Sequence, residues 1–263
     1  IEDNYQEIVP TEYRWSNWAQ NEEGITGDEL LEFVEKMFKD LKDLSIDENS
    51  DKRKILLKEF FADSHNYMKS GTLLRGVINK VNQLDFQSYD ERHAFNDIYE
   101  SILKDLQSAG NAGEYYTPRP VTDFIIDILS PKLGDKVADF ACGTGGFLIS
   151  AINYIKKNQG ADFTVDDLTT LGKSIYGIEK KPMPHMLCIT NMMLHDIDTP
   201  NVVHDNGLTK NVRDFKESEK VDVIAMNPPF GGTEEEIIKT NFPLEFRTSE
   251  TADLFLVRMM YQL

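Results

Sequence analysis

The sequence has few cysteines, no long apolar run and a shortage of positive charge. Its two cysteines, Cys142 and Cys188, give no disulfide framework and favour a reducing cytoplasm. No apolar run approaches the ~20 residues that cross a membrane, and the start shows no signal-peptide pattern. Lysine and arginine number 28 against 45 acidic residues, so the formal net charge is -17. That charge argues against a surface that attracts nucleic acid by itself.

The composition is that of a soluble globular protein, with 40% hydrophobic and 28% charged residues among 263. This length allows one large domain or two ordinary ones. The chain begins with Ile1 rather than methionine, and it stops at Leu263 inside a helical pattern. We therefore expect a fragment at both ends.

Apolar residues recur at helical spacing before residue 110. Thr26 and Glu29 form a capping-box pattern at the start of the first such segment. The apolar positions of three expected helices are Leu30, Val34, Phe38 and Leu41, then Leu74, Val77, Ile78 and Val81, then Phe95, Ile98, Ile102 and Leu106. We expect an all-α N-terminal domain over residues 1–110, with Trp15 and Trp18 as packing anchors.

The small residues 108–113 mark the domain boundary, and the pattern changes after them. Pro120 opens a helix that Pro131 and Gly134 end; its expected apolar face is Val121, Phe124, Ile125, Ile128 and Leu129. Short strand-like runs then alternate with helices or long crossovers, at 136–141, 174–179, 201–206 and 221–227. This order predicts an α/β domain over residues 111–263 with a doubly wound, mainly parallel sheet. Ligands bind at the carboxyl ends of the strands in such sheets.

A glycine-rich turn, "DFACGTGGF", follows the first strand at Asp139 to Phe147. Its glycines let the backbone approach a ligand closely, and the next helix points its first N–H groups there. The dinucleotide fingerprint fails because Leu148 stands at its third glycine, and the P-loop Gly-Lys is absent. The acidic Asp139 suits a ligand with an ammonium, such as the methionine part of S-adenosylmethionine. A tight turn without a ligand is the alternative.

Polar residues also end the next two strands. Glu179 can accept hydrogen bonds from both hydroxyls of a ribose, although a glutamate at a strand end is common. Its position, one crossover after the glycine turn, favours the interpretation of Glu179 as a ribose-binding residue. Asp205 and Asn206 end the following strand, where an adenine ring would lie.

The fourth strand runs into "NPPF", Asn227 to Phe230. Asn227 offers an acceptor oxygen, and the two prolines aim the Pro228 carbonyl without competing N–H donors. Two such acceptors suit a planar –NH₂ group, because holding both hydrogens frees the nitrogen lone pair to attack a methyl group. Phe230 offers a face for ring stacking. The alternative is a proline-stiffened loop without chemistry.

Taken together, "DFACGTGGF" and "NPPF" resemble the amino-group class of S-adenosylmethionine-dependent methyltransferases. The segment "GEYYTPRPVTDFIIDILSPKLGDKVADFACGTGGF" and the later "RTSETADLF" narrow the resemblance. They are similar to the adenine-specific DNA methyltransferase (modification) subunit of type I restriction–modification systems. The helical region before residue 110 looks like that family's N-terminal domain. The resemblance covers nearly the whole chain and implies that the C-terminal part of the catalytic domain is missing.

The resemblance implies roles at the matching positions. The residues that would close over the methionine end of the cofactor are Glu114, Tyr115, Tyr116, Thr117, Pro118 and Arg119. Those that would hold the rest of it are Gly143, Thr144, Gly145, Gly146 and Glu179, with Asp205 or Asn206 at its adenine. Asp139 joins the cofactor-binding set as the carboxylate suited to the ammonium of the methionine part. The target adenine would be held by Asn227, Pro228, Pro229 and Phe230. The family often has Gly where Asp205 stands, so the choice between Asp205 and Asn206 stays open.

The implied reaction is methyl transfer from S-adenosylmethionine to the exocyclic amino group of adenine in duplex DNA, with the base flipped out of the helix. No metal is expected, since the five histidines show no ligand spacing, and nothing indicates Cys142 as a covalent nucleophile. The implied partners are duplex DNA, a DNA-specificity subunit, a restriction (translocase/nuclease) subunit and a second copy of the modification subunit. The charge of -17 fits a partner that supplies much of the groove contact.

Two alternatives stay open at this point. The chain could be a methyltransferase that acts on RNA or on a protein glutamine, because the grip on an –NH₂ group is the same there. It could also be a scaffold subunit that binds the cofactor and is inactive without partners.

Overall fold

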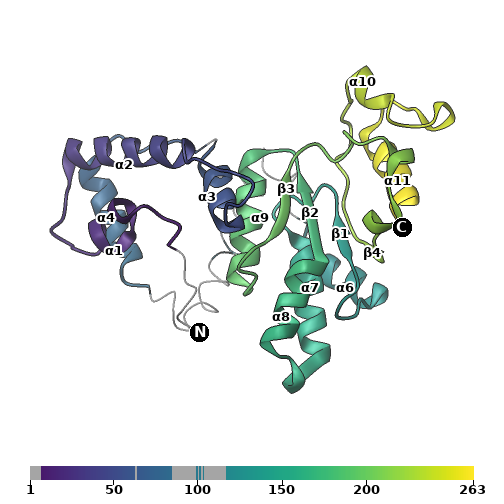
Figure 1. The fold of residues 1–263 in the computed structure, drawn as a ribbon, viewed down its shortest axis with the longest axis horizontal. Coiled ribbons are helices and arrows are strands. Elements are labelled where there is room, and N and C mark those ends of the chain that lie inside the picture. The colour runs from purple at the N-terminus through teal and green to yellow at the C-terminus, as the bar shows by residue number, and fades with distance from the viewer. Residues whose placement is uncertain (1–6, 63, 85–98, 100, 102, 104–116) are drawn as a thin grey trace. The chain divides into compact units, whose positions relative to one another are not determined.

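The computed structural model of the chain describes residues 7–62, 64–84, 99, 101, 103 and 117–263 (Figure 1). The chain divides into two compact units, Ile1–Arg92 and His93–Leu263. The expected boundary at residues 108–113 lies outside the described residues. So does the helix expected from Phe95 to Leu106, apart from Tyr99, Ser101 and Leu103.

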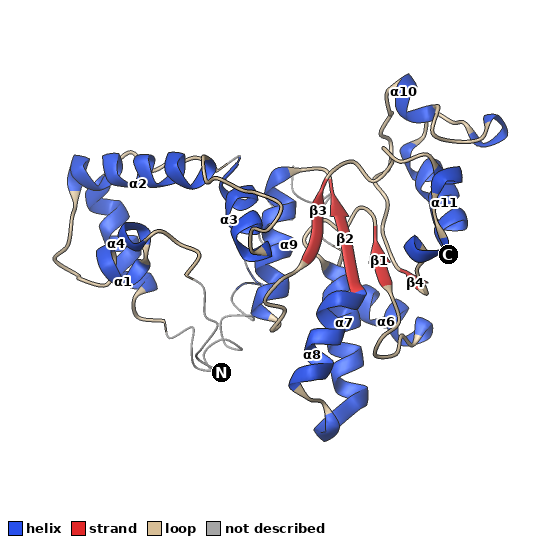
Figure 2. Cartoon of the chain, viewed as in Figure 1, coloured by secondary structure: helices blue, strands red, loops and turns tan. Residues whose placement is uncertain are grey.

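Within its described residues, the first unit consists of helices and loops (Figure 2). Its elements are a 3₁₀ turn at Thr11–Tyr13, α1 at Trp15–Trp18, α2 at Gly27–Lys42, α3 at Lys52–Ala62 and α4 at Gly71–Val81. The core contains Leu30, Val34 and Leu41 from α2 and Ile78 from α4, as the helical spacing predicted. Phe38 is partly buried against that core.

The start of α2 differs from the prediction. Thr26 stands at the N-cap, but its side chain makes no capping hydrogen bond, so the expected capping box with Glu29 is wrong. Tertiary packing holds this turn instead. The start of α4 approaches it so closely that a Cβ added to Gly71 would lie 1.7 Å from the Gly27 carbonyl oxygen.

A buried arginine ties α4 to the loop before α2. Arg75 is 6% exposed. Its guanidinium donates to the Ile25 carbonyl at 2.7 and 2.9 Å, to the Ala19 carbonyl at 3.1 Å and to the Trp18 carbonyl at 3.4 Å. The cation is therefore satisfied by main-chain oxygens. Trp18 packs on the core as expected, whereas Trp15 is 40% exposed.

The second unit is built on a four-stranded parallel sheet in the order β3-β2-β1-β4, which Figure 1 labels across the view. The strands are β1 at Val137–Asp139, β2 at Ile175–Glu179, β3 at Asn201–His204 and β4 at Val223–Ile224. The chain moves outward from β1 through β2 to β3 and then returns to the other side of β1. This reversal places the topological switch point, where such sheets bind ligands, between β1 and β4.

Helices cover both faces of this sheet. The helices in the described part of this unit are α6 at Arg119–Leu129, α7 at Gly146–Gln159, α8 at Val165–Ser174, α9 at Pro182–Leu194, α10 at Glu236–Lys239 and α11 at Thr251–Gln262, with 3₁₀ turns at Gly160–Asp162, Val212–Asp214, Glu217–Glu219 and Leu244–Phe246. Ala138 of β1 and Ile178 of β2 share a core with Leu254 of α11. Gly177 points the opposite way, where Leu148 of α7 would lie 3.0 Å from an added Cβ. This arrangement confirms the doubly wound α/β class.

The fourth strand is shorter than predicted. The sequence indicated a strand over 221–227, but β4 contains only Val223 and Ile224. Main-chain pairing with β1 stops at Ala225, whose N–H donates to the Ala138 carbonyl at 3.1 Å. Asn227 therefore lies beyond the sheet, on a loop.

The helix predicted after Pro120 exists as α6, but its predicted apolar face is not its buried face. Val121, Phe124 and Ile128 are 46%, 64% and 66% exposed, whereas Thr122 and Ile126 are buried. Packing on α7 decides the orientation. The Thr122 hydroxyl lies 2.7 Å from the Ser150 hydroxyl, and this buried polar contact requires its side of α6 to face α7.

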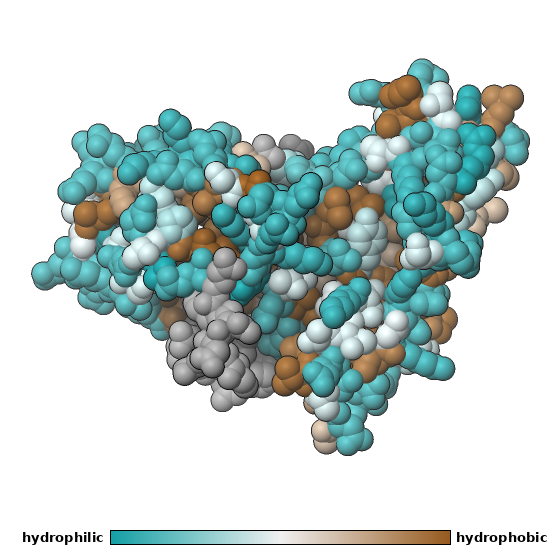
Figure 3. Space-filling view, in the orientation of Figure 1, coloured by the Kyte–Doolittle hydropathy of each residue, from teal (hydrophilic) through white to brown (hydrophobic). Residues whose placement is uncertain are grey.

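The visible surface is mostly hydrophilic, with apolar side chains exposed over the α10 segment (Figure 3). Ile237 in α10 is 67% exposed, and Leu244 shortly after it is 78% exposed. Within the part of the chain that the structure describes, no helix has both the length and the apolar character needed to cross a membrane.

Candidate active site

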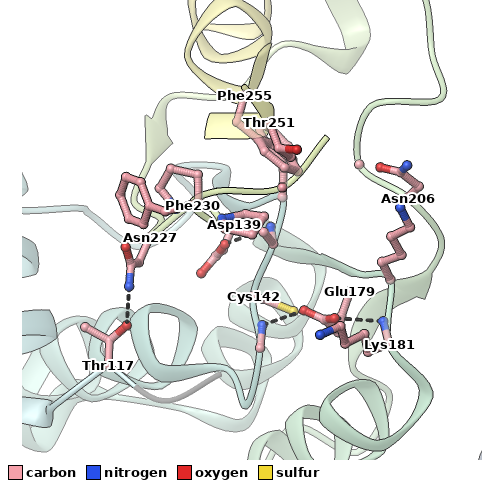
Figure 4. A pocket seen from close by; sticks show the side chains of 18 of the residues that line it. Thr117, Asp139, Cys142, Glu179, Lys181, Asn206, Asn227, Phe230, Thr251 and Phe255 are labelled. Carbon is pink, nitrogen blue, oxygen red and sulfur yellow. Dashed lines mark hydrogen bonds between the residues drawn. The ribbon is translucent and has the colours of Figure 1, made fainter. Parts of the chain in front are cut away.

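A cavity of about 770 Å³ lies at the carboxyl ends of the strands (Figure 4). Its wall combines the glycine turn, the ends of β2 and β3, the "NPPF" loop and the start of α11. The predicted site residues that line it are Thr117, Asp139, Gly143, Gly146, Glu179, Asn206, Asn227, Pro228, Pro229 and Phe230. The volume falls in the ordinary range for small-molecule pockets, roughly 300–1,000 Å³.

The glycine turn depends on left-handed backbone angles. Gly143 has φ 54° and Gly145 has φ 84°, a region that side chains rarely adopt. A Cβ on Gly145 would also lie 2.8 Å from the Cys188 sulfur. Gly143 therefore requires glycine for its backbone conformation, and Gly145 requires it for both backbone and steric reasons.

Neighbouring helices hold the turn from outside the cavity. The Asn191 amide of α9 donates to the Thr144 carbonyl at 3.0 Å, and the Arg119 guanidinium of α6 donates to the Gly146 carbonyl at 2.8 Å. Thr144, Gly145, Pro118 and Arg119 do not line the cavity. Thr144 is thus the part of the turn that α9 holds, and Arg119 supports the turn from α6; neither side chain lines the cavity where direct cofactor contact was expected.

Asp139 ends β1 at the entrance of the turn and is 1% exposed. Burial raises its pKa to about 8, and the Ala141 N–H that it accepts at 3.1 Å opposes this rise. The negative charge of Glu179 raises the pKa further. A cation bound beside Asp139 would favour the ionised carboxylate.

Glu179 ends β2 and is 6% exposed. One carboxylate oxygen accepts the Gly143 N–H at 2.9 Å, and the other accepts the Lys181 N–H at 2.8 Å. Burial raises the pKa of Glu179, and the same backbone donors oppose that rise. Each oxygen keeps one further lone pair, so the fixed carboxylate can still accept two hydroxyl groups.

At the end of β3, Asn206 lines the cavity, whereas Asp205 is exposed and does not. The Asn206 side chain is fixed at both ends. Its Oδ1 accepts the Leu208 N–H at 3.0 Å, and its Nδ2 donates to Glu234 Oε2 at 2.9 Å. Of the two residues proposed for the same role, Asn206 has the suitable position.

The "NPPF" loop forms one side of the cavity. The Asn227 Nδ2 donates to the Thr117 hydroxyl at 3.4 Å, as Figure 4 shows, and this arrangement leaves Oδ1 as an acceptor. Phe230 is 75% exposed, so its ring is open for stacking. The loop is tied to the start of α11, because the Thr251 N–H donates to the Gly232 carbonyl at 3.1 Å.

Several residues of this wall were not predicted from the sequence. Lys180, Glu234, Thr251 and Phe255 all line the cavity. Thr251 and Phe255 belong to the "RTSETADLF" segment, which carried the family resemblance without a role for either residue. Glu234 stands in a run of three glutamates with no pattern that marks it. Glu114, Tyr115 and Tyr116 lie outside the described residues.

Cys142 of the glycine turn and Cys188 of α9 have their sulfur atoms 3.7 Å apart, and both cysteines are free and buried. The contact with the Cys188 thiol and burial hold the pKa of Cys142 well above its ordinary value. The reactive thiolate is therefore disfavoured. Among the residues that the structure describes, no group of three metal-ligating side chains could hold a metal ion.

Comparison with known proteins adds an independent line of evidence. The family model described as "N-6 DNA Methylase" matches residues 90–263, and the "HsdM N-terminal domain" model matches residues 1–81. The EcoEI type I restriction enzyme methylase subunit from Escherichia coli is 55% identical over 97% of this chain and 52% of its own length. The EcoKI methylase subunit from Escherichia coli K12 is 29% identical, over 86% of this chain and 42% of its own.

Solved structures show the same similarity. A modification subunit assigned to a type I restriction enzyme of Vibrio vulnificus YJ016 is 39% identical with a TM-score of 0.84, over 99% of this chain and 56% of that one. A chain from a solved type I R-M system is 37% identical with a TM-score of 0.85, over 97% of this chain and 51% of that one.

The chain spans about half the length of the curated relatives it matches. The match to the methylase family covers the whole of the described second unit from residue 117 onward, including every residue of the cavity. We conclude that the chain belongs to the N-6 DNA methylase family, among the methylase (modification) subunits of type I restriction enzymes.

Proposed function

We propose that this chain contains the catalytic site of an adenine-specific DNA methyltransferase that uses S-adenosylmethionine. Its substrate is duplex DNA, and the product carries a methyl group on the exocyclic nitrogen of adenine. The working form is a type I restriction–modification complex with a DNA-specificity subunit, a restriction subunit and a second modification subunit. Because DNA is the substrate, this complex would work in the cytoplasm.

One observation supports this proposal most strongly. A single cavity is lined both by the glycine turn with its two acidic strand ends and by the "NPPF" loop. The residues expected to bind the cofactor and those expected to hold the amine thus line the same cavity. Transfer of a group between two bound molecules requires this, because the reacting atoms must come within about 3–3.5 Å of each other.

The donor and acceptor groups fit S-adenosylmethionine. Asp139 suits the ammonium of its methionine part, and Glu179 keeps two lone pairs for the ribose hydroxyls. Asn206 lines the cavity at the end of β3 and would contact the adenine of the cofactor. When bound, this cofactor supplies an electrophilic methyl group on a sulfonium.

Asn227 and Pro228 would hold the amino group of the target adenine. Asn227 Oδ1 and the Pro228 carbonyl each accept one N–H, which favours a tetrahedral nitrogen and releases its lone pair. Asp139, Glu179 and Asn206, which would hold the cofactor, would present its methyl group to this nitrogen, and the amino group would give up one proton on methylation. The exposed Phe230 ring would stack on the flipped base and offset part of the cost of unstacking, by roughly 1–3 kcal/mol.

The charge of the chain supports a division of labour within the complex. A net charge of -17 is unfavourable for contact with the phosphate backbone. A specificity subunit that supplies groove contacts removes this difficulty. Of the alternatives left open by the sequence, the family description favours DNA over RNA or protein as the acceptor.

The test is Asn227→Ala in the full-length protein assembled with its partner subunits. We expect cofactor affinity within about threefold of wild type and at least a ~100-fold loss of methyl transfer, typical of removing one group that acts on the transition state. Mass analysis of the DNA would locate the methyl group. Asn158→Ala, an exposed asparagine of α7, is the matched control and should keep full activity. A normal rate of methyl transfer by the Asn227 variant would refute the proposal. So would methylation by the wild-type complex of RNA or protein alone.

A further inference from the structure

Glu234 is a nearly buried carboxylate in the cavity that has no role in the function proposed above. Its side chain is only 8% exposed, although it lies in the run Glu234–Glu236. It belongs to the same loop as Asn227, and that loop lines the cavity continuously from Asn227 to Glu234. The loop therefore extends from the amine-holding motif to the ends of β2 and β3.

Two contacts hold the Glu234 carboxylate, and they differ in strength. Lys180 Nζ lies 3.4 Å away, but the lysine side chain is 60% exposed, so this ion pair contributes little. The Asn206 Nδ2 donates to Glu234 Oε2 at 2.9 Å from a partly buried position. A hydrogen bond to a charged acceptor is roughly twice as strong as a neutral one. The contact with Asn206 is therefore the important one.

This contact determines which way the Asn206 amide faces. The Glu234 carboxylate has acceptors and no donor, so the end of the Asn206 amide that faces it must be the Nδ2 donor. The Leu208 N–H is a donor, so the end that faces it must be the Oδ1 acceptor. A flipped amide would place two acceptors together and two donors together. The fixed amide keeps one N–H and one lone pair for a ligand. Asparagine pairs with an adenine edge through these two groups, a donor to a ring nitrogen and an acceptor from the amino group.

We propose that Glu234 is a positioning residue for the nucleoside end of the cofactor pocket, where it orients Asn206 to select adenine. This inference rests on the proposed function only in requiring an adenosyl cofactor. Glu234 acts at a distance from the reacting atoms. The amine-holding part of the loop has its own anchors, because Gly231 N–H donates to Glu250 at 2.9 Å and the Gly232 carbonyl accepts from Thr251. Loss of Glu234 should thus weaken cofactor binding and leave the transfer step nearly unchanged.

The test compares S-adenosylhomocysteine with S-inosylhomocysteine by calorimetry on the full-length protein. In the inosyl compound the amino group is replaced by a carbonyl and the adjacent ring nitrogen carries a hydrogen, so the donor and acceptor are exchanged. Wild type should prefer the adenosyl ligand. Glu234→Ala should weaken adenosyl binding roughly tenfold, the effect of losing one charged hydrogen bond, and should reduce the preference by a similar factor. A general loosening of the loop would weaken both ligands equally.

The design also uses three further single variants and one double variant. Glu234→Gln keeps an acceptor oxygen for Asn206 and should retain most of the preference. Lys180→Met removes the exposed ion-pair partner and should change the preference between the two ligands by less than about twofold. Asn206→Ala should lose the same preference as Glu234→Ala, and the double variant should lose no more than either alone.

The outcomes separate this inference from the function on which it rests. Wild-type affinity and preference in Glu234→Ala, or additive losses with Asn206→Ala, would overturn the role of Glu234 alone. A wild-type protein that fails to bind S-adenosylhomocysteine would overturn the proposed cofactor itself. Equal melting temperatures of the variants without ligand show that folding is not the cause. In methyl-transfer assays, KM for the cofactor should rise about tenfold with kcat within about threefold of wild type.

Discussion

Asp139→Asn should remove most of the pH dependence of cofactor binding. In the free protein, burial raises the pKa of Asp139 to about 8, so near neutral pH this carboxyl group carries a proton. Binding of an ammonium beside it requires the ionised form. The free energy of deprotonation is therefore subtracted from the binding energy at every pH below about 8.

The size of the effect follows from the shifted pKa. With a pKa of about 8, the ionised fraction of Asp139 is roughly 0.3% at pH 5.5 and roughly 25% at pH 7.5. The dissociation constant for S-adenosylmethionine should therefore fall roughly 75-fold across this range. Above it the ligand's own α-amino group begins to lose its proton, with a pKa near 8, and the curve flattens.

Calorimetric titration at five pH values between 5.5 and 7.5 measures this dependence, and repeating it in buffers of different ionisation enthalpy counts the released proton. Wild type should release close to one proton per cofactor at pH 6. Asp139→Asn should release almost no proton. Its affinity should approach that of wild type at pH 5.5, where the Asp139 side chain of wild type is also uncharged. Glu179→Gln is the control, and it should weaken binding at every pH while keeping most of the slope. A flat wild-type curve, or an unchanged slope in Asp139→Asn, would refute the reasoning.

The same proton affects the stability of the free protein. Asp139 holds in the folded state a proton that the unfolded chain releases above about pH 4. Raising the pH therefore works against the folded state until the pH passes about 8. Between pH 5.5 and 7.5 this group alone removes about 2.6 kcal/mol of unfolding free energy. The difference between wild type and Asp139→Asn in urea titrations should show this slope.

The remaining predictions concern stability and the glycine turn. Arg75→Met should destabilise the first unit by about 2–4 kcal/mol in urea denaturation, because several buried carbonyls lose their donor. Arg53→Met in α3, whose side chain is 38% exposed and pairs with Asp51, should cost clearly less. Equal losses of stability in the two variants would contradict the importance of the hydrogen bonds from Arg75 to main-chain carbonyls. Gly145→Ala should abolish cofactor binding, and adding Cys188→Ala should restore it only in part, since the clash goes but the left-handed strain stays. Gly76→Ala in α4, where an added Cβ meets nothing within 4 Å, should instead raise stability by about 0.5–1 kcal/mol. A loss of stability in this variant would contradict the helix-propensity argument.

The sequence predicted the class of the second unit because its pattern is local. Strand-like runs separated by helices imply parallel pairing, and the carboxyl ends of parallel strands meet at one edge. Asp139, Glu179 and Asn206 were therefore correctly expected to lie together, and all three line one cavity. The strand order and the extent of β4 were not predictable in this way, because they depend on which strands pair.

Helical periodicity predicted where helices lie better than which side they bury. In α2 the apolar positions are the buried ones. In α6 the apolar stripe is exposed, and Thr122 is buried against Ser150 instead. Hydrophobic spacing reports only a contrast between the faces of one helix, while the partner helix decides which face it covers.

By itself, the sequence determined the helical first unit, the parallel α/β class of the second and the motifs that surround the cavity, because backbone conformation and periodicity are encoded within a few neighbouring residues. Only the tertiary structure decided the contacts between distant positions. The amide of Asn227 meets Thr117 across 110 residues, and Asn206 meets Glu234 across 28. Such pairs form where elements distant in the sequence come together, so their interaction free energy depends on the packing of the whole unit. No local sequence pattern predicts them.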